Sequence, residues 1–106
     1  MMASFKDVFI QAIHDKMKVR ITFFSKEDGK DITRLCAPMD YGPGRKMHDQ
    51  SDRYWLWDYN SDTGVHPLPL KEEQIRSMVV LEDSFDPDEF IRTFSSAPSW
   101  IIPRDW

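Results

Sequence analysis

The stretch Arg53–Tyr59, which reads RYWLWDY, decides the fold because four of its seven residues carry large aromatic rings. Aromatic side chains fit the pleated, half-buried surface of a β-sheet, so the stretch predicts a strand. Side chains alternate between the two faces of a strand. One face therefore presents Tyr54, Leu56 and Asp58, and the other presents Arg53, Trp55, Trp57 and Tyr59. Both faces need an apolar partner, which predicts a sheet covered on both sides.

The composition is that of a folded protein of one domain, spanning residues 1–106. Of the 106 residues 41% are hydrophobic and 13% aromatic, enough to offset the chain entropy lost on folding. The formal net charge is −4 and the pI is near 5.2, which argues against duplex DNA binding by the chain itself.

Cysteine usage and the N-terminus indicate the compartment. Cys36 is the single cysteine, so an internal disulfide is excluded. The N-terminal residues carry charges every few positions and contain no apolar run of signal-peptide or membrane-spanning length. We therefore expect a cytoplasmic protein that does not enter a membrane.

Upstream of the aromatic stretch, the spacing of apolar residues predicts a helix and then a hairpin. The helix, at about 4–17 with Ser4 as N-cap, is predicted by one stripe of side chains: Phe5, Val8, Phe9, Ala12, Ile13 and Met17. From residue 19 the period changes to two, which predicts strands at about 19–25 and 32–39 around a turn containing Gly29. Pro38 indicates an edge or a bulge, and residues 40–52 read as a polar loop.

Downstream, two further strands and an aromatic tail are expected. Residues 65–70 contain Pro67 and Pro69, which exclude a fully paired central strand. A strand of about eight residues follows from Ile75, and Pro87 can open one turn of helix. The extension at about 85–106 has no period but is rich in large apolar side chains, so it should pack across the domain or a neighbour.

These elements predict a mainly β (α+β) fold. About five strands within residues 19–82 can close only as a small curled sheet or barrel. The N-terminal helix should lie across this barrel, and the irregular C-terminal tail should cover apolar surface.

The order of these features resembles the WYL domain family. The resemblance rests on V-x-I-x-F at 19–23, the turn at Gly29, Arg34 before Pro38, the YWLWDY run, and a final Val-rich strand ending in Phe85. It covers residues 5 to about 85, with the two aromatics of the name motif exchanged at Tyr54 and Trp55. It implies an SH3-like or Sm-like five-stranded barrel.

The resemblance also implies a function. WYL domains usually accompany a helix-turn-helix in bacterial transcription regulators and are thought to sense ligands, including nucleotides or single-stranded nucleic acid. We therefore expect a regulatory ligand-sensing module, acting through a partner in transcription regulation or in stress or defence signalling. Nothing precedes the first helix, so this chain should not itself bind an operator.

The candidate binding surface combines arginines with aromatic rings. Arg20 and Arg34 lie mid-strand, and a guanidinium grips phosphate or carboxylate oxygens. Bases can stack on aromatic rings. The predicted ligand-binding residues are Arg20, Arg34, Tyr54, Trp55 and Trp57, with Arg45, Lys46 and Arg53 as an extension. The alternatives are that the arginines lie on a solvated face or pair with Asp, and that the rings are buried under the helix or the tail.

Reaction chemistry is not expected. His14, His48 and His66 are scattered, and no pattern of metal ligands, paired catalytic carboxylates, nucleophile elbow or phosphate loop occurs. Cys36 could be a thiolate activated by Arg34, although a buried, inert cysteine is commoner. We expect a protein that is not an enzyme and has no cofactor or metal.

Two functions remain open. The first is binding of an anionic small molecule or nucleotide. The second is a protein–protein interaction or dimerisation module without a small ligand. If the tail covers Trp55 and Trp57 and no groove opens beside Arg34, the second is favoured.

Overall fold

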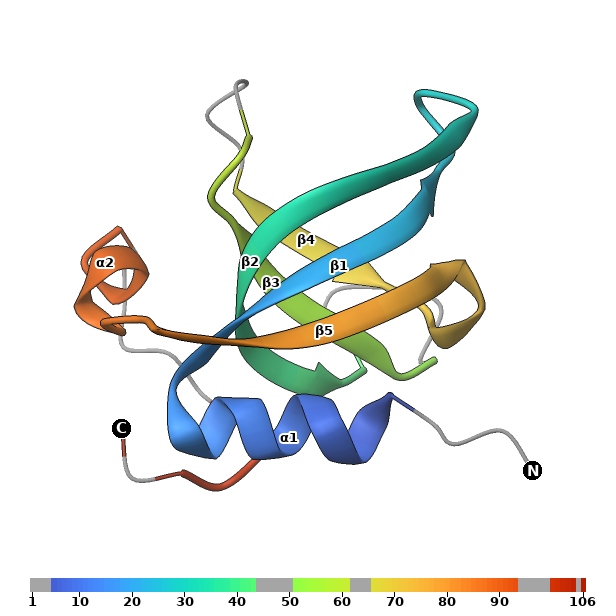
Figure 1. Ribbon diagram of the computed structural model, residues 1–106. Coiled ribbons are helices and arrows are strands. Elements are labelled where there is room, and N and C mark those ends of the chain that lie inside the picture. Colours follow the sequence, from blue (N-terminus) through green and yellow to red (C-terminus); the bar gives the residue numbers. More distant parts are fainter. Residues whose placement is uncertain (1–4, 44–50, 62–65, 94–99, 105) are drawn as a thin grey trace.

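The computed structural model describes residues 5–43, 51–61, 66–93, 100–104 and 106. Five antiparallel strands form one curled sheet, and the first helix lies across one end of it (Figure 1). The elements are α1 (Lys6–Asp15), β1 (Met17–Ser25), β2 (Lys30–Gly42), β3 (Arg53–Asp58), β4 (Pro67–Leu70), the 3-10 turn η1 (Glu72–Gln74), β5 (Ile75–Ser84) and α2 (Asp88–Ile91).

The strand order explains why the sheet curls. The order is β4-β3-β2-β1-β5, so the two outermost strands are consecutive in the chain. Only Lys71 and the short turn η1 connect the end of β4 to the start of β5, which forces the two edges of the sheet towards each other. This confirms the predicted fold class, a small barrel-like α+β structure with an N-terminal helix.

Helix α1 ends where the backbone turns left-handed. Lys16 has φ 56° and ψ 48°, and its N–H donates back to the carbonyls of Ala12 and Ile13, which terminates the helix and starts β1 at Met17. The helix is therefore shorter than the predicted 4–17. Phe9 and Ile13, from the predicted apolar stripe, are fully buried.

The β1–β2 hairpin forms as predicted. Its register pairs Val19 with Cys36 and Ser25 with Lys30, and Gly29 adopts the positive φ of 66° in the turn. Such a conformation costs glycine little because it has no Cβ.

Strand β2 is longer than predicted, and this is a correction. It continues to Gly42, so the first three residues of the expected loop at 40–52 pair with β3. A register shift between Pro38 and Asp40 marks a bulge, which confirms the interpretation of Pro38. The extra residue at the bulge accommodates proline, which has no backbone N–H to donate, and β2 pairs with β3 again from Asp40. Residues 44–50 of the expected loop lie outside the described residues.

The two edge strands, β4 and β5, lie where the prolines and the apolar residues of the sequence predict strands. Pro67 and Pro69 lie in β4, at one edge of the sheet, where a missing backbone N–H is tolerated. Strand β5, at the other edge, has 10 residues and is slightly longer than the sequence suggested.

Two hydrophobic clusters cover the two faces of β3. The inner cluster contains Tyr54 and Leu56 together with residues of α1, β1 and β2. In the outer cluster Trp57 packs with buried Phe85 and Phe90, and Trp55, Trp100 and Trp106 lie against it. The prediction that both faces of the aromatic strand are covered is confirmed, and so is the packing of the tail.

Candidate ligand-binding site

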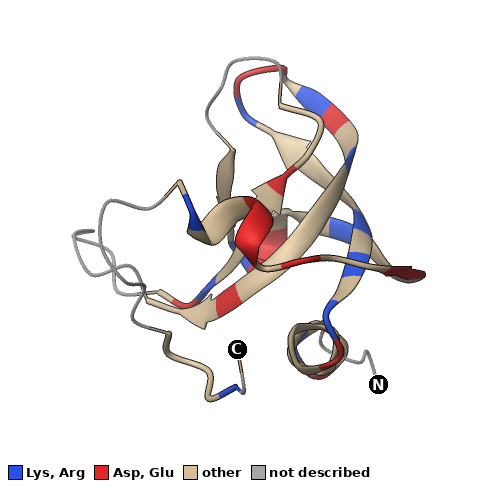
Figure 2. Cartoon of the chain, turned by 90° about the vertical axis from the view of Figure 1, so that its left-hand side faces the viewer, with Lys and Arg blue, Asp and Glu red and all other residues tan. Residues whose placement is uncertain are grey.

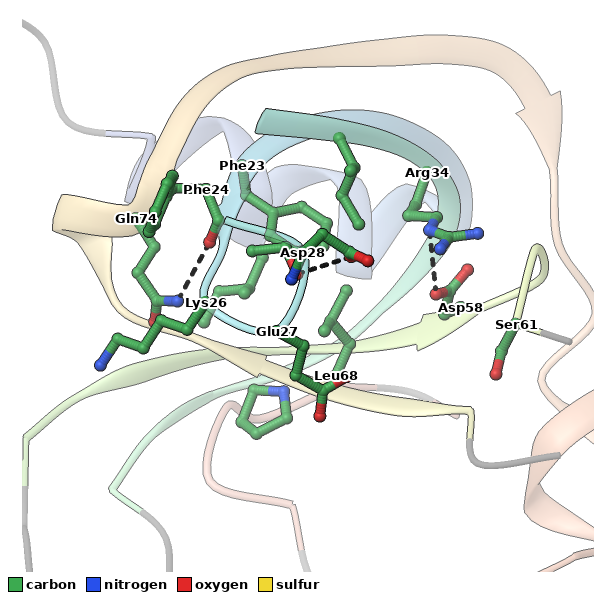
Figure 3. A pocket seen from close by; sticks show the side chains of 14 residues that line it. Phe23, Phe24, Lys26, Glu27, Asp28, Arg34, Asp58, Ser61, Leu68 and Gln74 are labelled. Carbon is green, nitrogen blue, oxygen red and sulfur yellow. Dashed lines mark hydrogen bonds and ion pairs between the residues drawn. The ribbon is translucent and has the colours of Figure 1, made fainter. Parts of the chain in front are cut away.

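A pocket of about 480 Å³ opens at one mouth of the curled sheet (Figure 3). We call it the mouth pocket. It lies between the β1–β2 turn, the ends of β3 and β4, and η1. Its lining residues are Phe23, Phe24, Ser25, Lys26, Glu27, Asp28, Ile32, Arg34, Asp58, Ser61, Leu68, Pro69, Leu70 and Gln74.

The inner wall of the mouth pocket is apolar. Phe23 of β1 pairs with Ile32 of β2, and the two side chains point to the inside of the sheet. Leu68 and Leu70 reach the same interior from β4, opposite Leu56 and Tyr54 of β3. This wall arises because alternate residues of three strands face inward. It can take the apolar body of a small molecule.

The polar end of the mouth pocket is formed by Arg34 and Asp58. Their side chains are 30% and 11% exposed, and Arg34 Nε lies 3.8 Å from Asp58 Oδ2. Arg34 Nη1 also donates to the carbonyl of Asn60 at 3.0 Å. Asp58 Oδ1 accepts the backbone N–H of Asn60 at 2.8 Å. The chain just after β3 therefore holds both charged groups at the edge of the apolar wall.

The opposite end is formed by the hairpin turn and η1. The Ser25 hydroxyl donates to Asp28 at 2.8 Å, and Gln74 Nε2 lies 3.5 Å from the carbonyl of Phe24. Lys26 and Glu27 extend this end into solvent. In all, the pocket lining has two basic and three acidic side chains.

The two predicted arginines do not form one site. Arg34 lies opposite Ile21 of β1, on the inner face, whereas Arg20 lies opposite Leu35 and Val79, on the outer face. Arg20 is exposed there, as the solvated-face alternative expects. Of the two, only Arg34 lines the mouth pocket.

The predicted stacking rings lie away from the mouth pocket. Tyr54 is 1% exposed, meets Phe9 and Tyr41 edge-on, and donates its hydroxyl to Glu72 at 3.0 Å. Because both neighbours cover its ring, Tyr54 belongs to the core.

The two tryptophans of β3 are packed on the other side of the sheet. Trp57 is 8% exposed and stacks on His66 with ring centroids 4.7 Å apart. Trp55 is half-buried, and its indole N–H donates to the carbonyl of Gly42 at 2.9 Å. This is the burial alternative stated above.

The predicted extension of the site is described only in part. Arg53 is half-buried at the start of β3, and its Nη1 lies 3.4 Å from the carbonyl of Ser51. It does not line the mouth pocket. Arg45 and Lys46 lie outside the described residues.

Cys36 shows no sign of activation. Burial raises the pKa of its thiol, and the charge of Asp58 raises it further, while Arg34 opposes them with a smaller effect. The thiol is therefore protonated at neutral pH, which is the inert alternative.

The described part of the chain has neither a metal-ligand cluster nor a membrane-spanning helix. It contains no group of three or more His, Cys, Asp or Glu residues placed to hold a metal ion. Among its helices, none has the length and apolar character needed to cross a bilayer.

Sequence reasoning missed a second polar cluster, which anchors the tail. The Asp40 carboxylate at the β2 bulge accepts the N–H groups of Ile101 and Ile102 at 2.8 and 2.9 Å, and Arg104 Nη2 lies 3.0 Å from it. The Arg104 guanidinium also donates to the carbonyl of Met39. Arg104 lies over two rings of the tail, 4.1 Å from the centroid of Trp100 and 4.5 Å from that of Trp106.

Burial lowers the pKa of Arg104 to about 10, although the charge of Asp40 opposes this shift, so the group is protonated at neutral pH. The sequence does offer one signal for this cluster: Arg104 is the only basic residue of the apolar segment 94–106, and a cation that is buried needs a carboxylate as its partner.

Charge is mixed over the molecule. Figure 2 shows acidic and basic positions interspersed along the strands, with the acidic helix α2 on the side that faces the viewer. Because the net charge is −4 and the basic residues are dispersed, the surface should attract a long polyanion such as DNA only weakly.

No family model and no curated protein matches this sequence. Among solved structures, the chain is similar to the proteasome accessory factor B/C (PafBC) of Arthrobacter aurescens, with a TM-score of 0.62 and 11% sequence identity. The match covers 92% of this chain but 14% of that protein. At this identity the similarity shows the fold alone.

Proposed function

We propose that this chain is a regulatory ligand-binding module without catalytic activity, and that its ligand occupies the mouth pocket. The observation that carries the proposal is a cavity with an apolar inner wall and a half-buried guanidinium, Arg34, at its edge. Ligand pockets commonly combine apolar walls with a few fixed polar groups. In this proposal, Arg34 contacts an anionic group of the ligand, such as a carboxylate or phosphate.

The regulatory part of the proposal has two supports. The sequence resembles the WYL domain family, and the fold is similar to part of PafBC, which is named as an accessory factor. A module of this size would report ligand binding to a partner protein in the cytoplasm. Transcription regulation and stress or defence signalling are the proposed settings.

The proposal can be tested with the full chain and a fragment library of small aromatic acids, amines, zwitterions and nucleotides. Binding is followed by two-dimensional NMR of ¹⁵N-labelled protein. The proposal expects some fragments to shift the amide signals of Phe23, Ile32 and Leu68. Arg34→Ala should abolish the shifts caused by acids, whereas Arg20→Ala, on the outer face, should leave them intact. If no fragment shifts these signals, the proposal fails.

A second candidate function is a dimerisation or protein-interaction module. It is favoured by strand β5, which pairs with β1 and carries Val79 and Val80 at 49% and 39% exposure. Exposed apolar residues on an edge strand are typical of strand addition by a partner. Sedimentation of wild type and of Val79→Lys tests it: a dimer that the lysine dissociates supports this function, and a monomer at high concentration contradicts dimerisation.

A further inference from the structure

We propose that the ligand of the mouth pocket is a small zwitterion, with an ammonium and a carboxylate next to an apolar body, as in an amino acid with a large apolar side chain. The inference rests on the proposed function and narrows its ligand class. It differs from a nucleotide or another polyanion in requiring both charges.

The first argument is the geometry of Arg34 and Asp58. The 3.8 Å between Nε and Oδ2 is longer than a hydrogen bond, so the pair attracts without saturating its donors and acceptors. A guanidinium has five N–H donors, and a carboxylate accepts at both oxygens. A carboxylate at Arg34 and an ammonium at Asp58 would satisfy both groups. An α-amino acid carries these two charges on one carbon, so it can reach both residues at once.

The second argument is charge balance. The mouth pocket is lined by Lys26 and Arg34 against Glu27, Asp28 and Asp58. Lys26, Glu27 and Asp28 all belong to the exposed turn, so Arg34 and Asp58 are the charged residues of this lining that are partly withdrawn from water. A ligand with two or more negative charges would meet one half-buried cation with the carboxylate of Asp58 beside it. A ligand of zero net charge avoids this repulsion.

The third argument is the shape and character of the wall. Phe23, Ile32, Leu68 and Leu70 form the apolar wall of the same pocket that Arg34 and Asp58 line. Figure 3 shows Phe23 and Leu68 in the pocket together with this pair. The volume of about 480 Å³ accommodates a molecule that is small but larger than its charged head group alone. The ligand therefore carries an apolar group that points from the charged end towards Phe23.

The test compares probes that share one phenyl body. L-Phenylalanine carries both charges, phenethylamine only the ammonium, and 3-phenylpropionate only the carboxylate; AMP represents nucleotides. Each is titrated into the full chain by NMR. Phenylalanine should bind at least about tenfold more tightly than the other three, because each charge-assisted hydrogen bond is worth about one tenfold step or more. The shifted amides should include Phe23, Ile32 and Leu68.

Variants then assign the two charges. Asp58→Asn should remove the advantage of phenylalanine over phenylpropionate, and Arg34→Gln its advantage over phenethylamine. Arg20→Gln is the control and should leave all affinities within about twofold, since a solvated surface charge contributes little. If a variant unfolds, the comparison of the four probes on wild type still decides the matter.

The outcomes separate this inference from the proposed function. If phenylpropionate or AMP binds the pocket as tightly as phenylalanine, or phenylalanine binds elsewhere, the zwitterion inference is overturned and the proposed function stands. The same holds if other library fragments fill the pocket and phenylalanine does not. If no fragment at all reaches the pocket, both fail together.

Discussion

The guanidinium of Arg104 and the carboxylate of Asp40 form an ion pair at 3.0 Å, with side chains only 2% and 10% exposed. They are 64 positions apart in the sequence, and the pair fixes the C-terminal segment to the bulge of β2. Because water is excluded from both groups, the loss of either leaves the other charge buried and uncompensated. This contact makes the tail part of the folded structure.

Replacing Asp40 by Asn should destabilise the protein by about 3–5 kcal/mol, the usual cost of breaking a buried ion pair on one side. The change also weakens acceptance of the N–H groups of Ile101 and Ile102. Urea denaturation, followed by tryptophan fluorescence, measures the free energy of unfolding. The matched control is Asp31→Asn, in the exposed pair with Arg76, which should cost no more than about 1 kcal/mol. Equal effects of the two variants would contradict the structural role of Asp40.

Replacing Gly42 by Ala should loosen the same tail. Gly42 has φ 146°, and an added Cβ would lie 2.5 Å from Cδ1 of Ile101. The expected loss is on the order of 3 kcal/mol, the upper end for a residue held in a sparsely populated backbone region. Gly29→Ala is the control: its φ of 66° is also unfavourable, but no atom lies within 4 Å, so about 1 kcal/mol is expected.

The steric and backbone parts can be separated in a second step. Adding Ile101→Ala to Gly42→Ala removes the close contact but leaves the backbone strain. Partial recovery of stability is expected in urea denaturation. If Gly42→Ala and Gly29→Ala cost the same, the close packing of Ile101 on Gly42 is refuted.

Replacing Trp57 by Ala tests whether this ring is structural. It lies between His66 and Phe90, with centroid distances of 4.7 and 5.7 Å. The expected destabilisation is about 3–5 kcal/mol, as for other buried large aromatics. Arg20→Ala should change stability by no more than about 0.5 kcal/mol, as is usual for surface substitutions. An unchanged melting temperature in Trp57→Ala would contradict the structural role and favour the prediction that Trp57 stacks on a ligand.

Cys36 should make stability fall at high pH. Its folded pKa is raised above the ordinary value of 9.0, so its contribution is complete below pH 9 and declines as pH rises and the unfolded thiol ionises. Between pH 8 and 10, wild type should lose more free energy of unfolding in urea than Cys36→Ala does. Tyr59, whose pKa is also raised by burial, acts in the same direction in both proteins. Rapid reaction of Cys36 with a disulfide reagent in the native protein at pH 7 would disprove its burial.

The sequence predicts those elements well whose pattern of apolar residues is contained within one short segment. The stripe containing Phe9 and Ile13 gives the helix, and the alternation from Val19 gives the first strand. The aromatic run gives both faces of β3, because side-chain direction alternates whatever the neighbours are.

The contacts that sequence did not predict depend on distant parts of the chain. From the sequence, Asp40 is predicted as a loop residue, because its partner Arg104 lies far downstream and no local pattern connects the two. The mouth pocket arises in the same way, because curling of the sheet brings Leu68 and Asp58 to Phe23. The sequence predicts Arg34 as a binding residue from its position within a strand. Asp58 becomes a candidate only because the structure places it next to Arg34.

The indole of Trp106 donates to the carbonyl of Ile13, linking positions 93 residues apart. A ribosome adds about 5–20 residues per second, so on the order of 5–20 seconds separate the synthesis of these two residues. Until then, the outer aromatic cluster lacks its last ring and stays open to water. The nascent chain therefore leaves part of its aromatic surface exposed to water until the segment carrying Trp106 has been made.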